Sequence, residues 1–387
     1  MSGSQDIAIS SRLFPPEVGA GAFRLGALAR ALARRGANVR VLTTTPPAHA
    51  PTTADPADVR VSRWPVLRDR GGNVRGYVQY ASYDAPLLVR LLATRFDVVV
   101  AESPPTTGLV TLVVAGLKRR PVVYYAADVW TDGVISMGAP RAVIGIMRWM
   151  ERTVLRHSRA IISVSAEVTE RLVLLGADEG RITTVGNGID TEIFTDQVEP
   201  MEGGPYFVYT GTMSEWQRPQ LFVEAFASLA QEFPDLRLRF FGQGAVEADI
   251  REMAERLVPG RVVFGGVVSP QESARWLRGA VGAMVSIAPG IGYDFAKPTK
   301  TYAAAATGTP VLFAGPATGA QLVKDAGLGV ATEFTPDAVA MGMRTLLQQA
   351  DDGTRAELRR SRAEWAREHV SLQAVGERVA EVVSAVV

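Results

Sequence analysis

Short apolar runs alternate with longer amphipathic segments along almost the whole chain, and this alternation restricts the possible folds more than any other feature. The runs are rich in Val, Ile, Tyr and Phe, which predicts buried strands, and the segments between them carry apolar residues at helical spacing. Strands that alternate with helices favour parallel sheets covered by helices. The expected strands are Asp6–Ser10, Val39–Thr44, Val59–Trp64, Asp97–Ala101, Val122–Tyr125, Ala160–Val164, Ile182–Val185, Tyr206–Thr210, Leu236–Phe241, Val262–Phe264, Gly282–Ile287, Val311–Ala314 and Gly329–Ala331.

The alternation is interrupted once, between Gly186 and Pro200, and this stretch is typical of an interdomain linker. A chain of 387 residues is also too long for one ordinary hydrophobic core. We therefore expect an α/β fold of two doubly wound domains, residues 1–190 and residues 191–369. A C-terminal helix at about 370–387 is expected to pack back on the first domain, with Trp365 holding the C-terminus there.

The composition excludes several kinds of site. Cysteine is absent, which rules out disulfides and thiolate metal sites and fits a reducing compartment. The histidines (His49, His157 and His369) are far apart in sequence, so no histidine-built metal site is expected. The N-terminus enters a strand without a basic and then apolar leader, and Glu102 interrupts the apolar run at 98–117. We expect a cytoplasmic protein that requires no metal.

Positive charge is concentrated in the first half of the chain. Residues 1–190 hold 23 Lys and Arg against 16 Asp and Glu, whereas the remainder holds 18 against 24. A basic half favours an anionic partner or surface. Five arginines recur along one expected helix, near 140–157, whose other face is apolar: Arg141, Arg148, Arg152, Arg156 and Arg159. Two interpretations stay open, a solvated helix face or peripheral contact with an anionic membrane. No nucleic-acid motif accompanies these residues.

The segment Lys297-Pro-Thr-Lys300 is the strongest candidate for an anion site. It follows an expected buried strand and opens an expected helix, with Pro298 suited to the first helical position. The chain has only four lysines (Lys118, Lys297, Lys300 and Lys324), and two of them flank this helix start. Free amides and the helix dipole make such a start a natural site for a phosphate or diphosphate. The alternative is a capped, solvated helix end.

A glycine-containing loop near the N-terminus resembles a dinucleotide fingerprint but departs from it. In Gly19-Ala-Gly21-Ala-Phe-Arg24, an arginine occupies the place of the third glycine. The second expected strand ends in threonines rather than in the acidic residue that would hold a ribose. We therefore do not expect NAD binding. The amides near Gly19 and Gly21 could still approach a phosphate or a sugar.

Ligands of doubly wound sheets bind outside the carboxyl ends of the strands, and two domains facing each other across such loops would form one cleft. Asp128 follows an apolar strand and precedes Trp130, which makes it the best candidate for a functional carboxylate in the first domain. The alternative is an Asp that caps the next helix. Glu102 and Glu17 are weaker candidates, each with a structural role as the alternative.

Several motifs together resemble the retaining family-4 glycosyltransferases (glycosyltransferase group 1) of the GT-B fold. They are Phe14-Pro-Pro-Glu-Val-Gly-Ala-Gly21 with Arg24, Ser103-Pro-Pro105, Asp128-Val-Trp130, Val185-Gly-Asn-Gly-Ile-Asp190, Gly242-Gln-Gly244, and Lys297-Pro-Thr-Lys300 through Gly308-Thr-Pro310. The resemblance covers nearly the whole chain. It implies two Rossmann-like domains across a cleft, the second binding a nucleotide-sugar donor, most often of UDP type, and the first binding a hydroxyl acceptor (a glycan, a lipid-linked molecule or a small molecule).

The resemblance also implies roles for individual residues. Lys300, with Lys297, would neutralise the diphosphate, and Asp128 would orient the acceptor hydroxyl while the leaving phosphate takes its proton. The catalytic candidates are Asp128, Lys300 and Arg218. The donor-binding candidates are Gly19, Gly21, Gly211, Thr212, Gly242, Gly244, Val267, Asp294, Lys297, Pro298, Thr299 and Tyr302, and the acceptor-binding candidates are Glu17, Arg24 and Glu102.

Two departures from the family pattern keep alternatives open. Where relatives often have a basic pair, this chain has Thr212 and Gln217, and Arg218 is a possible substitute. Where relatives have a carboxylate for the ribose, it has Ala303. A catalytically inactive GT-B partner subunit is therefore one alternative. A nucleotide-sugar epimerase of the same architecture is the other, although it would need a histidine and carboxylate set that this chain lacks.

Overall fold

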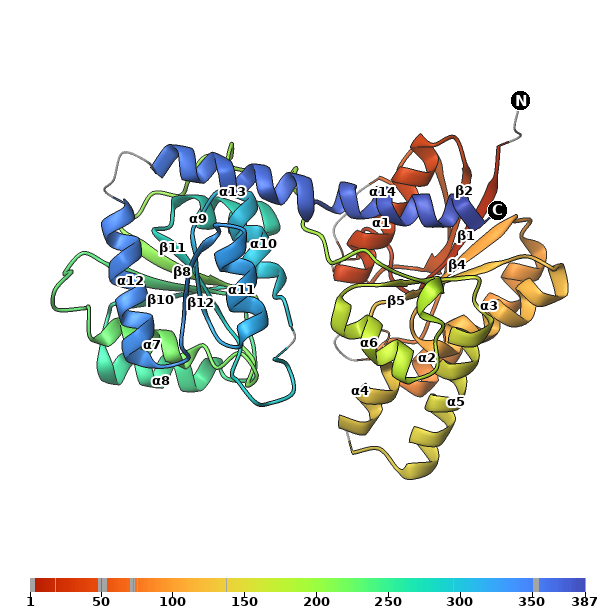
Figure 1. Ribbon diagram of the computed structural model, residues 1–387, viewed down its shortest axis with the longest axis horizontal. Helices are drawn as coiled ribbons and strands as arrows, with labels where there is room; N and C mark the ends of the chain where they lie inside the picture. The colour runs from red at the N-terminus through yellow and green to blue at the C-terminus, as the bar shows by residue number, and fades with distance from the viewer. Residues whose placement is uncertain are drawn as a thin grey trace. The chain divides into compact units, whose positions relative to one another are not determined.

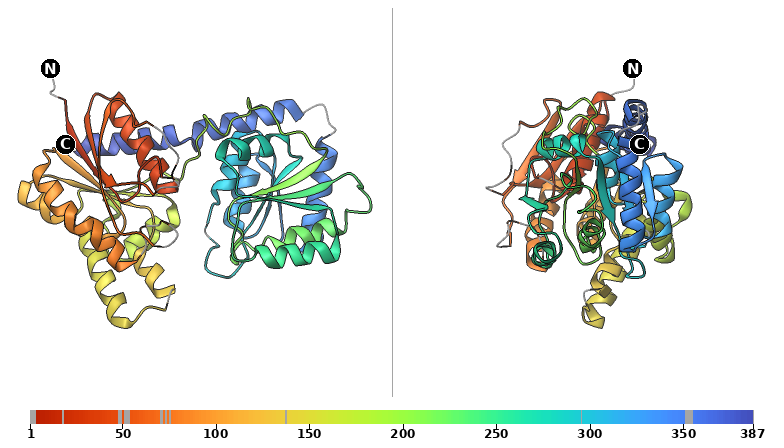
Figure 2. Two further views of the ribbon diagram at one scale, coloured as in Figure 1. Left: turned by 180° about the vertical axis from the view of Figure 1, so that it is seen from behind. Right: turned by 90° about the vertical axis from the view of Figure 1, so that its left-hand side faces the viewer.

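The computed structural model describes residues 4–17, 19–47, 50, 54–69, 72, 74, 76–136, 138–294, 296–350 and 355–386. Val18 and His49 lie outside them. The chain folds as two compact units: unit 1 comprises Met1–Asn187 and Leu372–Val387, and unit 2 comprises Gly188–Ser371. Each unit is one parallel sheet with helices on both faces (Figures 1 and 2). The expected fold of two doubly wound domains is confirmed.

Unit 1 contains a seven-stranded sheet in the order β3-β2-β1-β4-β5-β6-β7. Its strands are β1 (Asp6–Ser10), β2 (Asn38–Thr44), β3 (Val59–Trp64), β4 (Val98–Glu102), β5 (Val122–Ala126), β6 (Ala160–Ser163) and β7 (Ile182–Thr184). Its helices are α1 (Ala20–Arg34), α2 (Tyr77–Ala93), α3 (Pro105–Lys118), α4 (Trp130–Ser136), α5 (Arg141–His157), α6 (Ala166–Leu174) and α14 (Leu372–Val386), with a short 3₁₀ turn at Glu179–Arg181.

Successive residues of the central strands enter different cores, because side chains alternate across a sheet. Ile7 and Ile9 pack with α1 and α14, whereas Ala8 between them packs with α2, α3 and α5. Both faces of the sheet are therefore buried. This explains why its strands read as continuous apolar runs rather than as alternating apolar and polar residues.

Unit 2 contains a six-stranded sheet in the order β10-β9-β8-β11-β12-β13. Its strands are β8 (Tyr206–Thr210), β9 (Arg237–Phe241), β10 (Val262–Gly266), β11 (Gly282–Ser286), β12 (Val311–Ala314) and β13 (Gly329–Thr332). One face is covered by α7 (Gln220–Ala227), α8 (Glu247–Leu257) and α12 (Pro336–Ala350). The other is covered by α9 (Pro270–Gly279), α10 (Thr299–Ala306), α11 (Ala317–Asp325) and α13 (Arg355–His369).

The C-terminal helix α14 packs on α1 within unit 1, although α13 just before it belongs to unit 2. The two helices come close at Gly376, where a Cβ would lie 2.8 Å from the carbonyl carbon and oxygen of Ala27. Arg34, the last residue of α1, and Arg35, which follows it, pair with Glu377 at 2.7 and 3.0 Å. The expectation for Trp365 was wrong, because this side chain packs within unit 2 against Tyr302, with ring centroids 6.4 Å apart.

Each sheet has one point where the strand order reverses, between β1 and β4 in unit 1 and between β8 and β11 in unit 2. The loops after these strands diverge to opposite faces of the sheet and leave a crevice, where ligands of doubly wound folds bind. Ser11 and Ser103 follow β1 and β4, and Gly211 and Ile287 follow β8 and β11. Among the described helices, none combines the length and apolar character needed to cross a membrane.

Candidate functional site

A pocket of about 550 Å³ lies at the carboxyl ends of β8 and β11 in unit 2. The turn after β8 contributes Thr210, Gly211 and Thr212, and the start of α10 contributes Pro298, Thr299 and Lys300. The remaining lining residues are Ile189, Phe194, Trp216, Gln217, Ser273 and Ala303. None of these lining residues is acidic. The pocket thus brings the predicted donor-binding residues Gly211 and Thr212 together with the segment in which the sequence predicted an anion site.

Glycines allow the floor of this pocket to form. Gly211 has a φ of 106° and Gly242 a φ of 126°, which only glycine adopts readily. A Cβ at Gly242 would collide with the main-chain oxygen of Gly211, and one at Gly244 with the main chain of Met213. Gly242 and Gly244 therefore support the turn at Gly211 from behind, which gives these predicted donor residues a structural place beneath the pocket.

Among the described residues that line the pocket, Lys300 is the only basic one. Its Nζ lies 3.7 Å from the centroid of the Tyr209 ring, a cation–π distance. With its amide oxygen turned toward Lys300, Gln217 accepts a hydrogen bond from Nζ at 3.3 Å and donates one to Tyr209 Oη at 2.6 Å. Desolvation of the ammonium group places the pKa of Lys300 well below its usual value, and no carboxylate among the described residues pairs with it. A bound anion would restore the charged form.

The start of α10 supplies the second part of an anion site. The helix begins at Thr299, one residue later than expected, with Pro298 at the N-cap and no side chain capping the first amides. The residues from Thr301 to Ala306 are all buried, so the helix is fixed in place by packing. Unpaired amides and the positive end of the dipole point out of this end.

Several other predicted residues of unit 2 lie outside the pocket lining. Lys297 precedes the helix without lining the pocket, and Asp294 accepts a hydrogen bond from Gly290 N at 2.9 Å, which closes its own loop. Tyr302 is buried in the core, and Val267 is 68% exposed on the surface. Arg218 has a left-handed backbone and lies over the Phe334 ring, 5.8 Å from its centroid. Their proposed roles remain predictions.

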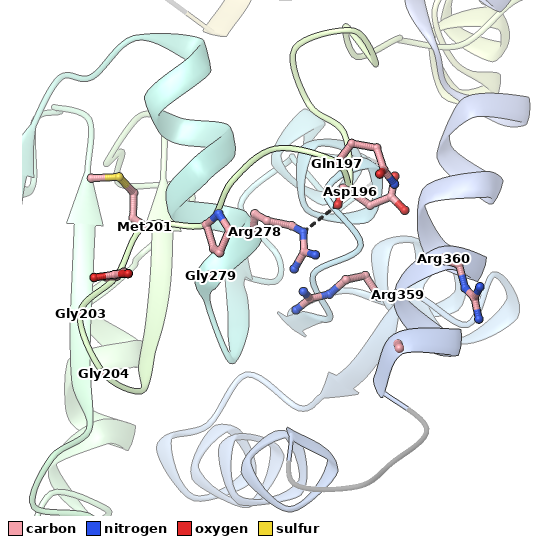
Figure 3. A pocket seen from close by; sticks show the side chains of 12 residues that line it. Asp196, Gln197, Met201, Gly203, Gly204, Arg278, Gly279, Arg359 and Arg360 are labelled. Carbon is pink, nitrogen blue, oxygen red and sulfur yellow. Dashed lines mark hydrogen bonds between the residues drawn. The ribbon is translucent and has the colours of Figure 1, made fainter.

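A second pocket in unit 2 has a larger volume, about 960 Å³, but it is not the candidate donor site (Figure 3). It is lined by Gly203 and Gly204, which precede β8, and by Arg278 and Gly279, which precede β11. These positions mark the amino ends of the strands, opposite to the end at which doubly wound sheets bind ligands. Figure 3 shows Arg278 held beside Asp196, whose main-chain oxygen accepts its hydrogen bond at 2.8 Å.

The corresponding crevice of unit 1 contains a buried carboxylate, Glu102, at the end of β4. Ser11 Oγ, which follows β1, donates a short hydrogen bond to Glu102 Oε2, and Arg24 Nη2 lies 3.9 Å from Oε1. A Cβ at Gly21 would lie 2.6 Å from Oε1, so a side chain there would require the Glu102 carboxylate to move. Burial raises the pKa of Glu102, against the opposing effects of Arg24 and Ser11, and the charge of Asp128 raises it further.

Asp128 is exposed at the end of β5 and makes no hydrogen bond or ion pair with the residues that the structure describes. The first amides of α4, which Asp128 was the alternative candidate to cap, donate instead to a buried glutamate. Trp130 N lies 2.9 Å from Glu151 Oε1 and Thr131 N lies 2.8 Å from Oε2. The capping explanation for Asp128 is therefore unnecessary, and its carboxylate is free to meet a substrate.

The remaining acceptor candidates are engaged within unit 1. Glu17 pairs with Arg68 at 2.7 Å and accepts a hydrogen bond from Thr44 Oγ1 at 3.1 Å. Arg24 donates to Asn187 Oδ1 at 3.2 Å as well as facing Glu102. Gly19, a predicted donor-binding residue in the same unit, has no atom within 4 Å of its Cβ position. These residues shape the crevice, and their contact with substrate stays a prediction.

Sequence reasoning missed three residues that the structure makes prominent. Tyr209 was read only as part of a strand, and Gln217 only as a departure from a basic pair. Arg12 is buried directly after β1, lies over Tyr80 at 4.3 Å from the ring centroid, and donates to Val74 O at 3.0 Å. No pattern in the sequence signals these contacts, because each joins segments far apart in the chain.

Two family models match the chain in succession. A model described as "Glycosyl transferase 4-like domain" matches residues 19–188, and one described as "Glycosyl transferases group 1" matches residues 204–349. The class defined by the fold is that of two-domain GT-B proteins, with two Rossmann-like units. Within it, the chain belongs to the glycosyltransferases of these families.

Solved structures show the same architecture at low sequence identity. Alr3699/HepE from Anabaena in complex with UDP and glucose has a TM-score of 0.67 and 15% identity, covering 98% of this chain and 100% of that one. The lipopolysaccharide glycosyltransferase WaaG has a TM-score of 0.70 and 18% identity, covering 98% and 99%. A putative UDP-N-acetylglucosamine 2-epimerase from Listeria monocytogenes has a TM-score of 0.61 and 14% identity, covering 99% of this chain and 96% of that one. No sequence among curated proteins matches significantly.

Proposed function

We propose that this glycosyltransferase moves a hexosyl or N-acetylhexosaminyl group from a UDP-sugar to a hydroxyl acceptor with retention of configuration. The observation that carries the proposal is Lys300, a half-buried lysine beside the uncapped start of α10 that has no carboxylate partner among the residues that the structure describes. A diphosphate supplies the missing negative charge for both. HepE, which shares the fold, binds UDP and glucose, and this supports a UDP donor.

Bond making and bond breaking would then proceed as follows. The bond between the anomeric carbon and the diphosphate oxygen breaks, and the acceptor oxygen bonds to the same face of the sugar. The acceptor proton passes to the departing phosphate oxygen, so the reaction needs no strong protein base. Lys300 and the α10 amides stabilise the charge that develops on the diphosphate, and Asp128 orients the acceptor hydroxyl.

Ligand-dependent thermal stability tests the donor assignment. A ligand of the native state adds RT ln(1 + [L]/Kd), about 2.7 kcal/mol at a hundredfold excess over Kd. UDP is expected to stabilise the wild type more than GDP, TDP or ADP, and to have little effect on Lys300→Met. Lys324→Met is the matched control, because Lys324 is an exposed lysine on α11 of the same unit. Absence of any nucleotide effect in the wild type would favour the inactive partner subunit.

A putative epimerase from Listeria monocytogenes shares this fold, which supports the epimerase alternative. The reaction product must therefore be identified to distinguish sugar transfer from epimerisation. The epimerase alternative requires a histidine at the site. The two histidines that the structure describes, His157 and His369, lie instead at the ends of α5 and α13, where each hydrogen-bonds its own helix. Incubation with a UDP-sugar and acceptor, followed by NMR of the products, is expected to show a new glycosidic bond with the donor's anomeric configuration. A change at a ring carbon of the free donor would contradict transfer.

The acceptor side of the proposal includes a peripheral contact with an anionic membrane from the cytoplasmic side. The five arginines in and just after α5 are all exposed: Arg141, Arg148, Arg152, Arg156 and Arg159. The only acidic residue of α5, Glu151, is fully buried against the start of α4, so the outer face of α5 presents positive charge alone. This favours membrane contact over an ordinary solvated helix face, which would carry charges of both signs.

A further inference from the structure

An apolar groove of about 570 Å³ lies within unit 1 between α2, α3 and α5. Its walls are mainly hydrocarbon, from Leu109 and Val110 of α3 and from Ile146, Met147 and Met150 of α5. Asp84 is the one charged side chain among the described residues that line it. Its Oδ1 accepts a hydrogen bond from Thr107 Oγ1 at 2.6 Å, and burial raises its pKa, which favours the neutral acid beside hydrocarbon.

One end of the α2–α3–α5 groove adjoins the candidate acceptor site. Tyr80, in the groove wall, lies under the guanidinium of Arg12, 4.3 Å from the ring centroid, and packs edge-on against Trp130 at 5.5 Å. Trp130 is two residues from Asp128. Pro104 and Thr106, also in the wall, follow Glu102 at the end of β4. The groove and the two carboxylates therefore share the carboxyl edge of the sheet.

The groove also borders a surface that combines exposed apolar side chains with positive charge. Tyr77 is 62% exposed, Ile146 57% and Trp149 59%. Arg148 and Arg152 are exposed beside them on α5. Large aromatic side chains interspersed with arginines are the composition that suits the interface between a membrane and water.

We infer that the α2–α3–α5 groove holds the hydrocarbon tail of a lipid-linked acceptor, with the anionic phosphate of that lipid near the arginines of α5 and its sugar-accepting end toward Asp128. This inference rests on the proposed transferase function and narrows its acceptor to a lipid phosphate. The apolar walls would exclude water from the chain, and the gain from each buried methylene is about fourfold in affinity.

Alkyl phosphates provide a direct probe. Hexyl, octyl, decyl and dodecyl phosphate, each below its critical micelle concentration, are titrated calorimetrically into the full-length protein saturated with UDP, so that the donor site is occupied. Affinity is expected to rise with each added methylene until the groove is filled. Equal affinities along the series would overturn the inference.

A pair of tryptophan substitutions on α2 tests whether the dependence of affinity on alkyl chain length arises in the groove. Ala85 and Ala93 are both exposed on α2, but only Ala85 lines the groove. Ala85→Trp is expected to remove the dependence on chain length and to weaken dodecyl phosphate binding by roughly tenfold or more, as blocking a few methylenes requires. Ala93→Trp is expected to leave binding unchanged. Dodecyl phosphate binding that survives in Ala85→Trp would place the tail elsewhere and overturn the inference.

Thermal stabilisation by UDP separates this inference from the function on which it rests. UDP is expected to stabilise the wild type and Ala85→Trp equally, because the groove and the donor pocket belong to different units. Stabilisation by UDP without any chain-length effect would remove the lipid acceptor and leave the transferase. A chain-length effect without stabilisation by UDP would support the groove and contradict the proposed donor.

Discussion

At the scale of single residues, the donor pocket depends on a lysine whose charge is not matched by the protein. Lys300→Met keeps the length and much of the apolar volume of the side chain but removes the ammonium group above Tyr209. UDP binding is expected to weaken by about 10- to 100-fold, because a charge-assisted hydrogen bond contributes roughly 1.5–3 kcal/mol. Calorimetric titration measures this. An unchanged dissociation constant would remove Lys300 from the donor site.

Asp128 is expected to affect turnover rather than donor affinity. Asp128→Asn keeps the shape of the side chain but lowers its ability to accept and orient an acceptor hydroxyl. Because Asp128 orients the acceptor hydroxyl while the phosphate takes its proton, kcat should fall by about 10²-fold through lost alignment while UDP binding stays the same. Asp132→Asn is a suitable control on the neighbouring helix α4, where Asp132 pairs with Arg171 at 2.7 Å. Wild-type turnover in Asp128→Asn would contradict the role.

Glu102 makes stability depend on pH, and the sign follows from its raised pKa. The folded protein holds this proton more tightly than the unfolded chain does. The favourable contribution is complete below the unfolded pKa of about 4.5 and is lost as pH rises through the folded value. The stability of Glu102→Gln relative to the wild type should therefore increase as pH rises from the unfolded pKa of Glu102 through its folded pKa. Urea unfolding from pH 4 to 8 measures the difference, and a constant difference would contradict the assignment.

At the scale of elements, the contact between α1 and α14 depends on the absence of a side chain at Gly376. Gly376→Ala would place a Cβ 2.8 Å from the main chain of Ala27, and the two helices would have to separate. Such overpacking is expected to cost about 1–3 kcal/mol of unfolding free energy. Gly116→Ala, in a helix with no atom within 4 Å of the Cβ position, should instead stabilise by about 0.5–1 kcal/mol. Thermal unfolding of both variants tests this, and effects of the same sign would contradict it.

The elements themselves were largely predictable. The strand from Val122 to Tyr125 and the helix near 140–157 follow from apolar runs and helical spacing, because both faces of each sheet are buried. The start of α10 was misplaced by one residue, since Pro298 suits the N-cap and the first helical position almost equally. The partner of the α4 amides was not predictable, because Glu151 lies on a different helix.

At the scale of the whole molecule, each unit has its own cores, and this predicts separable unfolding. Differential scanning calorimetry is expected to resolve two transitions. UDP should raise only the transition of unit 2, whereas Gly376→Ala should lower only that of unit 1. A single transition that both changes move together would show that the units unfold as one.

The sequence by itself determined the fold class, the two-domain organisation and the importance of the segment from Lys297 to Lys300. These properties follow from local periodicity and from spacing within a motif, and both depend only on residues that are close together in the sequence. Only the tertiary structure decided that Lys300 lies over Tyr209 without a carboxylate partner, that Glu151 rather than Asp128 meets the start of α4, and that α2, α3 and α5 enclose a groove. Contacts of this kind join residues that are distant in sequence, and burial and strand order bring them together.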